Sequence, residues 1–376
     1  MKIIYLSTAR LPTEKAYGVT VLESVHAANQ LGIEILVFAP GPKNLQRAEG
    51  VIHLPAIKFP NSLKKFNLGK IRKTVFGVNS LLAPLLAMPK REFRCSNYIW
   101  LRDPLSALMI GVIRPNKKLL LEIHHRPHGA GYLVLKVLLK LKNVSFSAIS
   151  PRLIGEILLD HPEIYIFEAP MAVPSDFFNN RELKSSGSIS RLIYVGKGQS
   201  SGIDNGLDHL VRDFSRAIKL LPGLSLTFLG LENDFKISLT NLGCELSIPK
   251  ENIKFMDHIP HDEVKTLLAE HDIGVLPYPR SKYNNERFPI KSLEYAASEL
   301  TIMASRIESH TELLGEARAY FYEPGVQNSF ESVLSQISSD ETLRNEKLDN
   351  ARIWSEGYTY EKRIQGIISK WLASIL

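Results

Sequence analysis

The sequence of 376 residues contains only two cysteines, Cys95 and Cys244, which are too few for a disulfide framework and fit a reducing cytoplasm. It also lacks any run of the ~18–20 apolar residues that a membrane-spanning helix needs. The N-terminus, MKIIYLSTARLP, has a short apolar run before a strand-breaking loop, so it predicts a first strand and not a signal peptide. These absences favour a soluble protein of the cytoplasm.

Acidic residues are scarce in one part of the chain. The net charge is +7, and between Val51 and Asn97 nine Lys and Arg residues accompany a single acid, Glu92. Aromatic and aliphatic residues alternate with these basic residues. The segment 58–94 therefore predicts peripheral contact with an anionic membrane or an acidic ligand; the alternative is the solvated face of a loop–helix insertion. We expect no nucleic acid as a partner.

Short apolar runs alternate with amphipathic helices, an order that is typical of a parallel sheet with helices on both faces. Strands are predicted at 2–7, 33–40, 98–102, 119–124 and 145–150. The pattern restarts with a strand at 191–198, after a stretch rich in Pro, Ser and Asn (168–188) that is interpreted as a linker. Length and restart together predict an α/β protein with two doubly wound, Rossmann-like domains facing each other across a cleft.

We expect an N-terminal domain over residues 1–175, a C-terminal domain over 176–355 and a final helix over 356–376 that packs back across the domain junction. In open sheets of this kind, ligands bind at the carboxyl ends of the strands.

One stretch of the second domain, NNERFPIKSLEYAASE (284–299), places Glu286 and Glu294 eight positions apart. Proline suits the first position of a helix, which is predicted here from Pro289 to about Ser298. The free N–H groups at a helix start favour a phosphate. Two flanking carboxylates would accept hydrogen bonds from hydroxyls on both sides of a diphosphate, as in a nucleotide sugar. The alternative is an ordinary solvated helix with Glu–Lys pairs.

The longer segment DIGVLPYPRSKYNNERFPIKSLEYAASELTIMAS resembles the signature of the retaining family-four glycosyltransferases, the glycosyl transferases group 1, which have the GT-B fold. A subtype of this family has the pattern E-x-F-P-x-K-x-x-E-Y-x-A. The residues that match it are Glu286, Phe288, Pro289, Lys291, Glu294, Tyr295 and Ala297. Weaker resemblances extend over nearly the whole chain, in GVTVLESVHAANQLGIEILVF, EAPMAVPSDFF, RLIYVGKG and IKFMDHIPHDEVKTLLAEHDIGVLP.

The resemblance implies a role for each matched residue. Glu286 would bind hydroxyls of the donor sugar, and Glu294 would bind those of the ribose. Lys197 would neutralise the diphosphate and the leaving group, and Gly18, in the N-terminal loop, would let the backbone approach the phosphate closely. Backbone groups at the helix start would hold the diphosphate and the sugar; they belong to Phe288, Pro289, Ile290 and Lys291.

Histidines gather in LEIHHRPHG (121–129), but their spacing matches no standard metal-ligand motif. In the family a histidine at the end of this strand faces the donor sugar, and His124 is the candidate; the alternative is a histidine satisfied by strand-end carbonyls. With Glu286 and Lys197 it completes the predicted catalytic residues. Arg102 and Asp103 follow a strand on the acceptor side, where they would contact the acceptor or form a structural pair. No Asp-x-Asp occurs, so the resemblance implies transfer without a metal or cofactor.

The chain departs from the family pattern in the turn QSSG, where Ser201 stands in place of a second basic residue. The diphosphate charge would then rest on Lys197, with help from Lys291 or Arg10. One glycine, Gly18, also stands where two are common, and SEL follows the motif helix where G-x-P is frequent.

Together these features predict a retaining glycosyltransferase that moves a hexose from a UDP- or GDP-sugar to a glycan or lipid-linked acceptor. Its role would be in surface polysaccharide or glycoconjugate biosynthesis, in the cytoplasm at the inner face of the membrane. The alternatives are a GT-B nucleotide-sugar epimerase and a catalytically silent protein that binds a nucleotide sugar or glycan.

Overall fold

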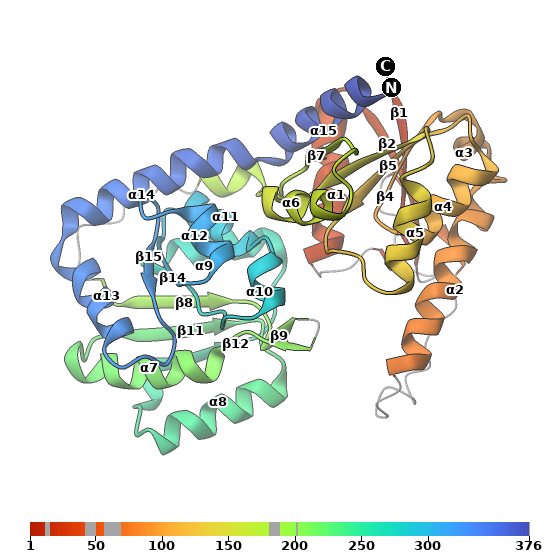
Figure 1. Ribbon diagram of the computed structural model, residues 1–376. Helices are drawn as coiled ribbons and strands as arrows, with labels where there is room; N and C mark the ends of the chain where they lie inside the picture. Colours follow the sequence, from red (N-terminus) through yellow and green to blue (C-terminus); the bar gives the residue numbers. More distant parts are fainter. Residues whose placement is uncertain (12–15, 42–49, 56–68, 180–188, 201, 376) are drawn as a thin grey trace. The chain divides into compact units, whose positions relative to one another are not determined.

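The computed structural model describes residues 1–11, 16–41, 50–55, 69–179, 189–200 and 202–375 (Figure 1). The chain folds into two compact units, one formed by Met1–Met171 with Tyr360–Leu376 and the other by Ala172–Thr359. Each unit contains one parallel sheet with helices. The predicted α/β class with two doubly wound sheets is confirmed. The predicted borders at 175 and 355 both fall inside the second unit.

The first unit is built on a seven-stranded sheet in the order β3-β2-β1-β4-β5-β6-β7, with every neighbouring pair parallel. Its strands are β1 (Lys2–Leu6), β2 (Glu34–Pro40), β3 (Val51–Leu54), β4 (Tyr98–Leu101), β5 (Lys118–Ile123), β6 (Val144–Ala148) and β7 (Ile166–Glu168). The chain leaves β1 and β4 towards opposite edges of the sheet. These two neighbouring strands therefore form its switch point, outside whose carboxyl ends ligands bind.

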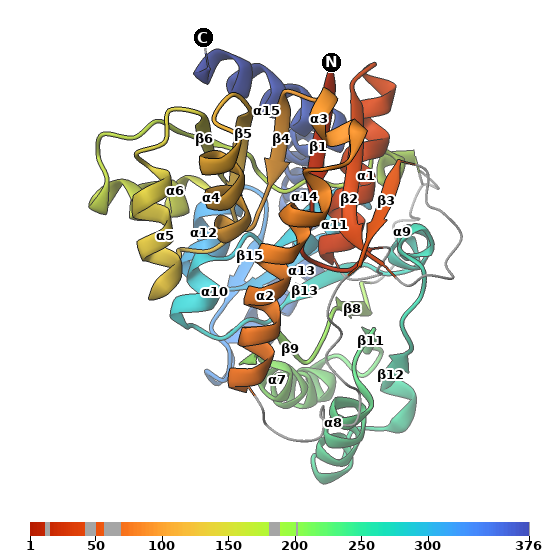
Figure 2. The same ribbon diagram turned by 90° about the vertical axis from the view of Figure 1, so that its right-hand side faces the viewer.

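Helices cover both faces of this first sheet. They are α1 (Ala16–Gln30), α2 (Gly69–Ala87), α3 (Arg91–Cys95), α4 (Pro104–Ile113), α5 (Ala130–Leu138), α6 (Pro151–Asp160) and α15 (Tyr360–Ser374). Figure 2 shows α2, α4 and α5 together on one face, with α4 packed against both of the others. The opposite face carries α1 and α15, which pack against each other.

The C-terminal helix α15 belongs to the first unit although it is last in the chain. Its Trp371 is fully buried and meets the ring of Tyr98 edge-on at 5.6 Å between centroids. Apolar residues recur at helical spacing along α15, and Ile364 and Ile367 on the same side are buried as well. The helix is thus held by its apolar stripe.

The second unit has a six-stranded parallel sheet in the order β12-β11-β8-β13-β14-β15. Its strands are β8 (Arg191–Val195), β11 (Ser225–Leu229), β12 (Ile253–Met256), β13 (Ile273–Leu276), β14 (Thr301–Ser305) and β15 (Tyr320–Tyr322). Its helices are α7 (Leu207–Leu220), α8 (Asn233–Glu245), α9 (His261–Ala269), α10 (Lys282–Glu286), α11 (Ile290–Ala297), α12 (Glu308–Leu314), α13 (Ser329–Ser339) and α14 (Glu341–Ser355). A hairpin of β9 (Gln199–Ser200) and β10 (Ile203–Asp204) follows β8.

The predicted linker 168–188 differs from the structure in its described part. Ala169, Ala172 and Val173 are buried, and Val173 forms a parallel bridge with Thr359. A short 3-10 helix, η2 (Ser175–Asn179), follows and buries Phe177. The prediction gave weight to proline and polar residues and overlooked the small apolar residues between them. Residues 180–188 lie outside the described part of the chain, as do Ser201 and residues 58–68 of the basic segment.

Among the described residues, no helix is both long enough and apolar enough to cross a membrane.

Candidate functional site

The ends of β8 and β13 form the switch point of the second sheet, because the chain leaves these neighbouring strands in opposite directions. The motif helix α11 is fixed above them by Tyr295, whose hydroxyl accepts a hydrogen bond from the Val195 N–H at 3.0 Å. A side chain on Gly274 of β13 would come within 2.3 Å of the Tyr295 ring, so this close packing requires glycine. The start of α11 therefore lies at the edge where ligands of such sheets bind.

Pro289 precedes α11 as its N-cap and is not its first helical residue, one position from the predicted start. The N–H groups of the first turn of a helix have no acceptor within the helix. Phe288 is buried against the ring of Tyr358, with centroids 6.2 Å apart, so its side chain anchors the loop before α11. A ligand would therefore contact the backbone of the loop before α11 and not the Phe288 side chain.

Glu286 ends α10, just before that loop, and its side chain is 14% exposed. Its Oε1 is buried and has no hydrogen-bond partner among the described residues; the nearest cation is Lys282, with 3.9 Å between Nζ and Oε1. A buried acceptor without a donor costs about 1–3 kcal/mol. A ligand hydroxyl would supply the missing donor.

Glu294 lies inside α11 and is 3% exposed. Its carboxylate accepts hydrogen bonds from Lys291 Nζ at 2.6 Å and interacts with His261 Nε2 at 3.3 Å. Burial alone would raise the pKa of Glu294, but Lys291 and His261 lower it to about 2, so the group is ionised at neutral pH. An ionised carboxylate has about four acceptor positions, which leaves room for a pair of hydroxyls. His261 was not predicted from the sequence.

Lys197 follows β8 and is half exposed, with its Nζ 3.1 Å from Oε1 of Glu232. Glu232 also accepts a hydrogen bond from the N–H of Gly198 at 3.2 Å. This pairing compensates the lysine charge that the sequence assigned to a diphosphate. A ligand phosphate would have to compete with Glu232 for it.

Arg287 is a second cation near this edge, and the sequence analysis missed it. Its guanidinium lies 4.0 Å above the Tyr278 ring and donates hydrogen bonds to the amide oxygens of Asn205 and Asn284, both at 3.2 Å. Among the described residues these partners are uncharged, and no carboxylate forms an ion pair with it. Asn205 in turn donates to the Lys197 carbonyl at 2.7 Å, which links the arginine to the turn after β8.

Arg287 could have been found from its place between Glu286 and Phe288. Sequence spacing alone, however, does not bring the turn after β8 next to it. That contact depends on Gly206, whose φ is +82° and where a Cβ would lie 2.3 Å from the carbonyl oxygen of Pro277. Only glycine allows this approach.

The remaining predicted residues lie in the first unit. Gly18 is buried within α1, which begins at Ala16, and so it is not in the loop where it was predicted. Asp103 is the N-cap of α4 and accepts hydrogen bonds from the N–H and hydroxyl of Ser106, both at 2.7 Å. Its carboxylate is committed to the helix start, as expected of a structural residue. Arg10 is exposed.

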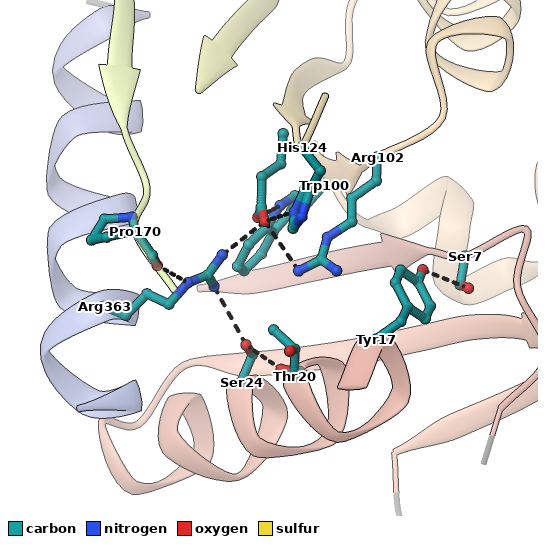
Figure 3. A network of polar contacts seen from close by, with 10 residues as sticks. Ser7, Tyr17, Thr20, Ser24, Trp100, Arg102, His124, Pro170 and Arg363 are labelled. Carbon is teal, nitrogen blue, oxygen red and sulfur yellow. Dashed lines mark hydrogen bonds and ion pairs between the residues drawn. The ribbon is translucent and has the colours of Figure 1, made fainter. Parts of the chain in front are cut away.

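Arg102 and His124 follow β4 and β5 and converge on one residue that the sequence analysis missed, Glu122 (Figure 3). Glu122 is fully buried; it also accepts hydrogen bonds from Trp100 Nε1 at 3.0 Å and from Arg363 of α15 at 2.8 Å. Burial would raise the pKa of Glu122, but the two arginines and His124 hold it well below its usual range.

The ionised state of Glu122 fixes the state of His124. Burial and the charge of Arg102 lower the pKa of His124 to about 4, so the ring is neutral at neutral pH. Its Nε2 must then carry the proton that is donated to Glu122, and Nδ1 keeps a lone pair. The predicted histidine is therefore held by a carboxylate and not by strand-end carbonyls. The described residues contain no group of three His, Cys, Asp or Glu placed to hold a metal ion.

Residues 190–340, which include the whole of this second-unit site, match the family model of the glycosyl transferases group 1. The chain carries a glycosyltransferase group 1 domain. No curated protein sequence matches this chain.

Solved structures with the same fold include sucrose-phosphate synthase from Thermosynechococcus elongatus, with a TM-score of 0.75, 15% identity and all of both chains covered. Another is HepE (Alr3699) from Anabaena in complex with UDP and glucose, with a TM-score of 0.67, 14% identity and coverage of 99% of this chain and 100% of that one. A third is WaaG, a glycosyltransferase involved in lipopolysaccharide biosynthesis, with a TM-score of 0.68, 11% identity and coverage of 98% and 99%. These likenesses show the two-domain GT-B fold.

The segment that matches the glycosyltransferase family model therefore has its motif at the edge of the sheet where ligands bind in this fold. Of the predicted second-unit residues, Glu286, Glu294, Lys291 and the segment from Phe288 to Ile290 lie around the start of α11. Lys197 lies across from them on the turn after β8, connected through Asn205 and Arg287.

Proposed function

We propose that this glycosyltransferase moves a sugar, with retention of configuration, from a nucleoside-diphosphate sugar to a glycan or lipid-linked acceptor. The observation that carries the proposal is the pair of buried carboxylates around the start of α11. Glu286 has an unpartnered acceptor atom, and Glu294 is ionised with acceptor positions to spare. Two such acceptors on either side of free helix N–H groups suit hydroxyls on either side of a diphosphate.

In this proposal the backbone from Phe288 to Lys291 binds the diphosphate, because free N–H groups and the helix dipole favour an anion there. Glu294 accepts hydrogen bonds from the ribose hydroxyls, and Glu286 accepts them from the sugar. Lys197 and Arg287 stabilise the negative charge that develops on the leaving diphosphate. The solved structure of HepE, which holds UDP and glucose, supports a UDP-sugar as the first donor to try.

A thermal-shift screen against UDP, GDP, ADP and their sugars tests the donor site. A ligand at one hundred times its Kd stabilises the native state by about 2.7 kcal/mol, so the correct nucleotide raises the melting temperature measurably. In Glu294→Ala the rise should disappear. Glu270→Ala, at an exposed position after α9, is the matched control and should keep it. If no nucleotide stabilises the protein, or if Glu294→Ala keeps the full shift, the donor site is wrong.

Turnover measurements separate the three functions that the sequence allows. Transfer that requires an added acceptor supports the glycosyltransferase. Conversion of the donor sugar without any acceptor would instead indicate an epimerase. Nucleotide binding with no turnover in the presence of varied acceptors would indicate a silent binding protein, for which the Lys197–Glu232 ion pair would be a reason.

We further propose that the first unit contacts an anionic membrane surface through the face formed by α2, α4 and α5 (Figure 2). Large apolar side chains on this face are 41–64% exposed: Val78, Leu81, Leu85, Val112, Ile113, Leu133 and Val137. The three helices contain no acidic residue. Lys136 and Lys140 are exposed beside the apolar residues. Exposed apolar residues with basic neighbours suit the interface of an anionic bilayer.

Sedimentation with lipid vesicles tests this face. The protein should bind vesicles that contain anionic phosphatidylglycerol more strongly than neutral phosphatidylcholine vesicles, and less strongly as salt is raised. Replacing Leu81 and Leu85 with Ser should weaken binding several-fold, because each removes buried apolar contact. Ile353→Ser, at a 61% exposed position on α14, is the control. Equal binding to both vesicles, or an equal effect of the control, contradicts the proposal.

A further inference from the structure

The buried polar groups at the carboxyl ends of β4 and β5 carry more positive than negative charge (Figure 3). Two guanidinium groups, those of Arg102 and Arg363, pair with the single carboxylate of Glu122 at 3.0 and 2.8 Å. The three side chains are 12%, 1% and 0% exposed. An unbalanced charge in such surroundings is costly unless an opposite charge approaches it.

On β1 and at the end of β4, two polar atoms have no hydrogen-bond partner among the described residues. They are the hydroxyl of Tyr5, a residue that is 2% exposed, and Nε of Arg102. Tyr5 of β1 is paired in register with Trp100 of β4, and their rings meet edge-on at 5.3 Å. Side chains two residues apart on a strand share a face, so Tyr5 and Arg102 point to the same side of the sheet. Both unpartnered groups can donate a hydrogen bond.

Tyr17 and Glu122 lie against the Arg102 guanidinium. The Tyr17 ring lies 5.0 Å from the Arg102 guanidinium, and the Tyr17 hydroxyl donates a hydrogen bond to the Ser7 hydroxyl at 2.8 Å. Glu122 and Arg363 lie behind the arginine and are closed to solvent. Arg102 and His124 are the partly exposed members of the set. The site also lies at the switch point of the first sheet, between β1 and β4, where the fold places ligands.

We propose that Tyr5 and Arg102 form an anion site that binds the phosphate or carboxylate group of an acidic acceptor. An oxyanion offers acceptors to both unpartnered donors and balances the excess charge, whereas a neutral sugar does only the first. Arg102 binds the oxyanion directly. Glu122 and Arg363 are positioning residues that hold its guanidinium in place. The inference rests on the proposed function, since it names the class of acceptor that this glycosyltransferase uses.

The test compares the binding of glucose 6-phosphate, glucuronate and glucose by calorimetry at constant ionic strength. The nucleotide found in the thermal-shift screen is present at saturation, so that phosphate-binding positions of the second unit are occupied. We expect at least one of the acidic sugars to bind about tenfold more tightly than glucose, as a charge-assisted hydrogen bond predicts. The two acidic probes distinguish a phosphate from a carboxylate as the preferred group.

Tyr5→Phe is the decisive variant, because it removes only the unpartnered hydroxyl. Its melting temperature should stay the same or rise, while binding of the acidic sugar weakens at least about threefold. Arg102→Lys keeps the charge, loses the planar fork and should weaken binding further. Tyr322→Phe removes a hydroxyl that is equally buried and also unpartnered, but in the second unit, and should leave binding unchanged.

The outcomes keep this inference separate from the proposed function. If nucleotides bind but neither acidic sugar binds more tightly than glucose, the anion site is wrong and the donor site stands. The same conclusion follows if Tyr5→Phe and Arg102→Lys bind the acidic sugar as the unmodified protein does. If no nucleotide binds, the proposed function fails whatever the sugars do.

Discussion

Arg287 supplies a second basic residue near the diphosphate position, which the turn QSSG lacks. The sequence places the diphosphate charge on Lys197, with help from Lys291 or Arg10, and in the structure Lys197 pairs with Glu232 and Lys291 pairs with Glu294. Arg287 is held by two amide oxygens and the face of a tyrosine ring, which orient its guanidinium without balancing its charge. An oriented cation with no carboxylate partner among the described residues suits a phosphate better than a lysine in an ion pair does.

We therefore expect Arg287→Met to weaken binding of the nucleoside diphosphate by about tenfold, because a charge-assisted hydrogen bond contributes about 1.5–3 kcal/mol. Binding of the corresponding nucleoside, which lacks phosphates, should stay the same. Calorimetry with both ligands measures the difference.

Arg280→Met is the control for Arg287→Met, since Arg280 is an exposed arginine that precedes α10 and donates to a backbone carbonyl. A loss of nucleoside binding equal to that of the diphosphate would mean that Arg287 supports the loop and not the phosphate. A loss in the control as large as in Arg287→Met would point to net charge alone.

At the scale of elements, the sequence predicted the strands well because their patterns are local. Buried parallel strands are short apolar runs, and those at 2–7, 33–40 and 119–124 correspond to β1, β2 and β5. The strands of the first sheet that were missed, β3 and β7, have four and three residues, and the missed β15 of the second sheet has three. Strands this short form because neighbouring strands pair with them. They are too short to show a periodic pattern in the sequence.

Residues of the candidate site were likewise predicted where the pattern is local and missed where it is not. Glu286 and Glu294 were found because one motif contains both of them and the helix between them. His261 and Glu122 were not found, because each interacts with a charged residue on another element. Glu122 looked like one charge in an apolar strand, LLLEIH, and only the packing of β4 and α15 against it reveals its three cationic or histidine partners. Contacts between distant elements are what local patterns omit.

At the scale of the whole molecule, the first and the last residues of the chain both belong to the first unit. It leaves the first unit at Met171, builds the second and returns at Tyr360, so the first unit is complete only after the last helix has formed. Arg363 connects α15 to the segment that ends at Met171, because it donates hydrogen bonds to the carbonyl of Pro170 at 2.7 Å and to Glu122 at 2.8 Å. The stability of the first unit should therefore depend on α15, and that of the second should not.

Ending the chain after Thr359 tests this dependence. The shortened protein loses the fully buried Trp371 and one of the two arginines of Glu122, and removing a partner from a buried ion pair costs about 3–5 kcal/mol. Hydrogen exchange should then accelerate in β1, β4 and α1, whereas β8, β13 and α11 keep their protection. A chain ending after Ser374 retains α15 and serves as the control. Equal acceleration in both sheets would show that α15 stabilises the molecule as one body, and unchanged exchange in the first sheet would show that Glu122 and its partners hold without it.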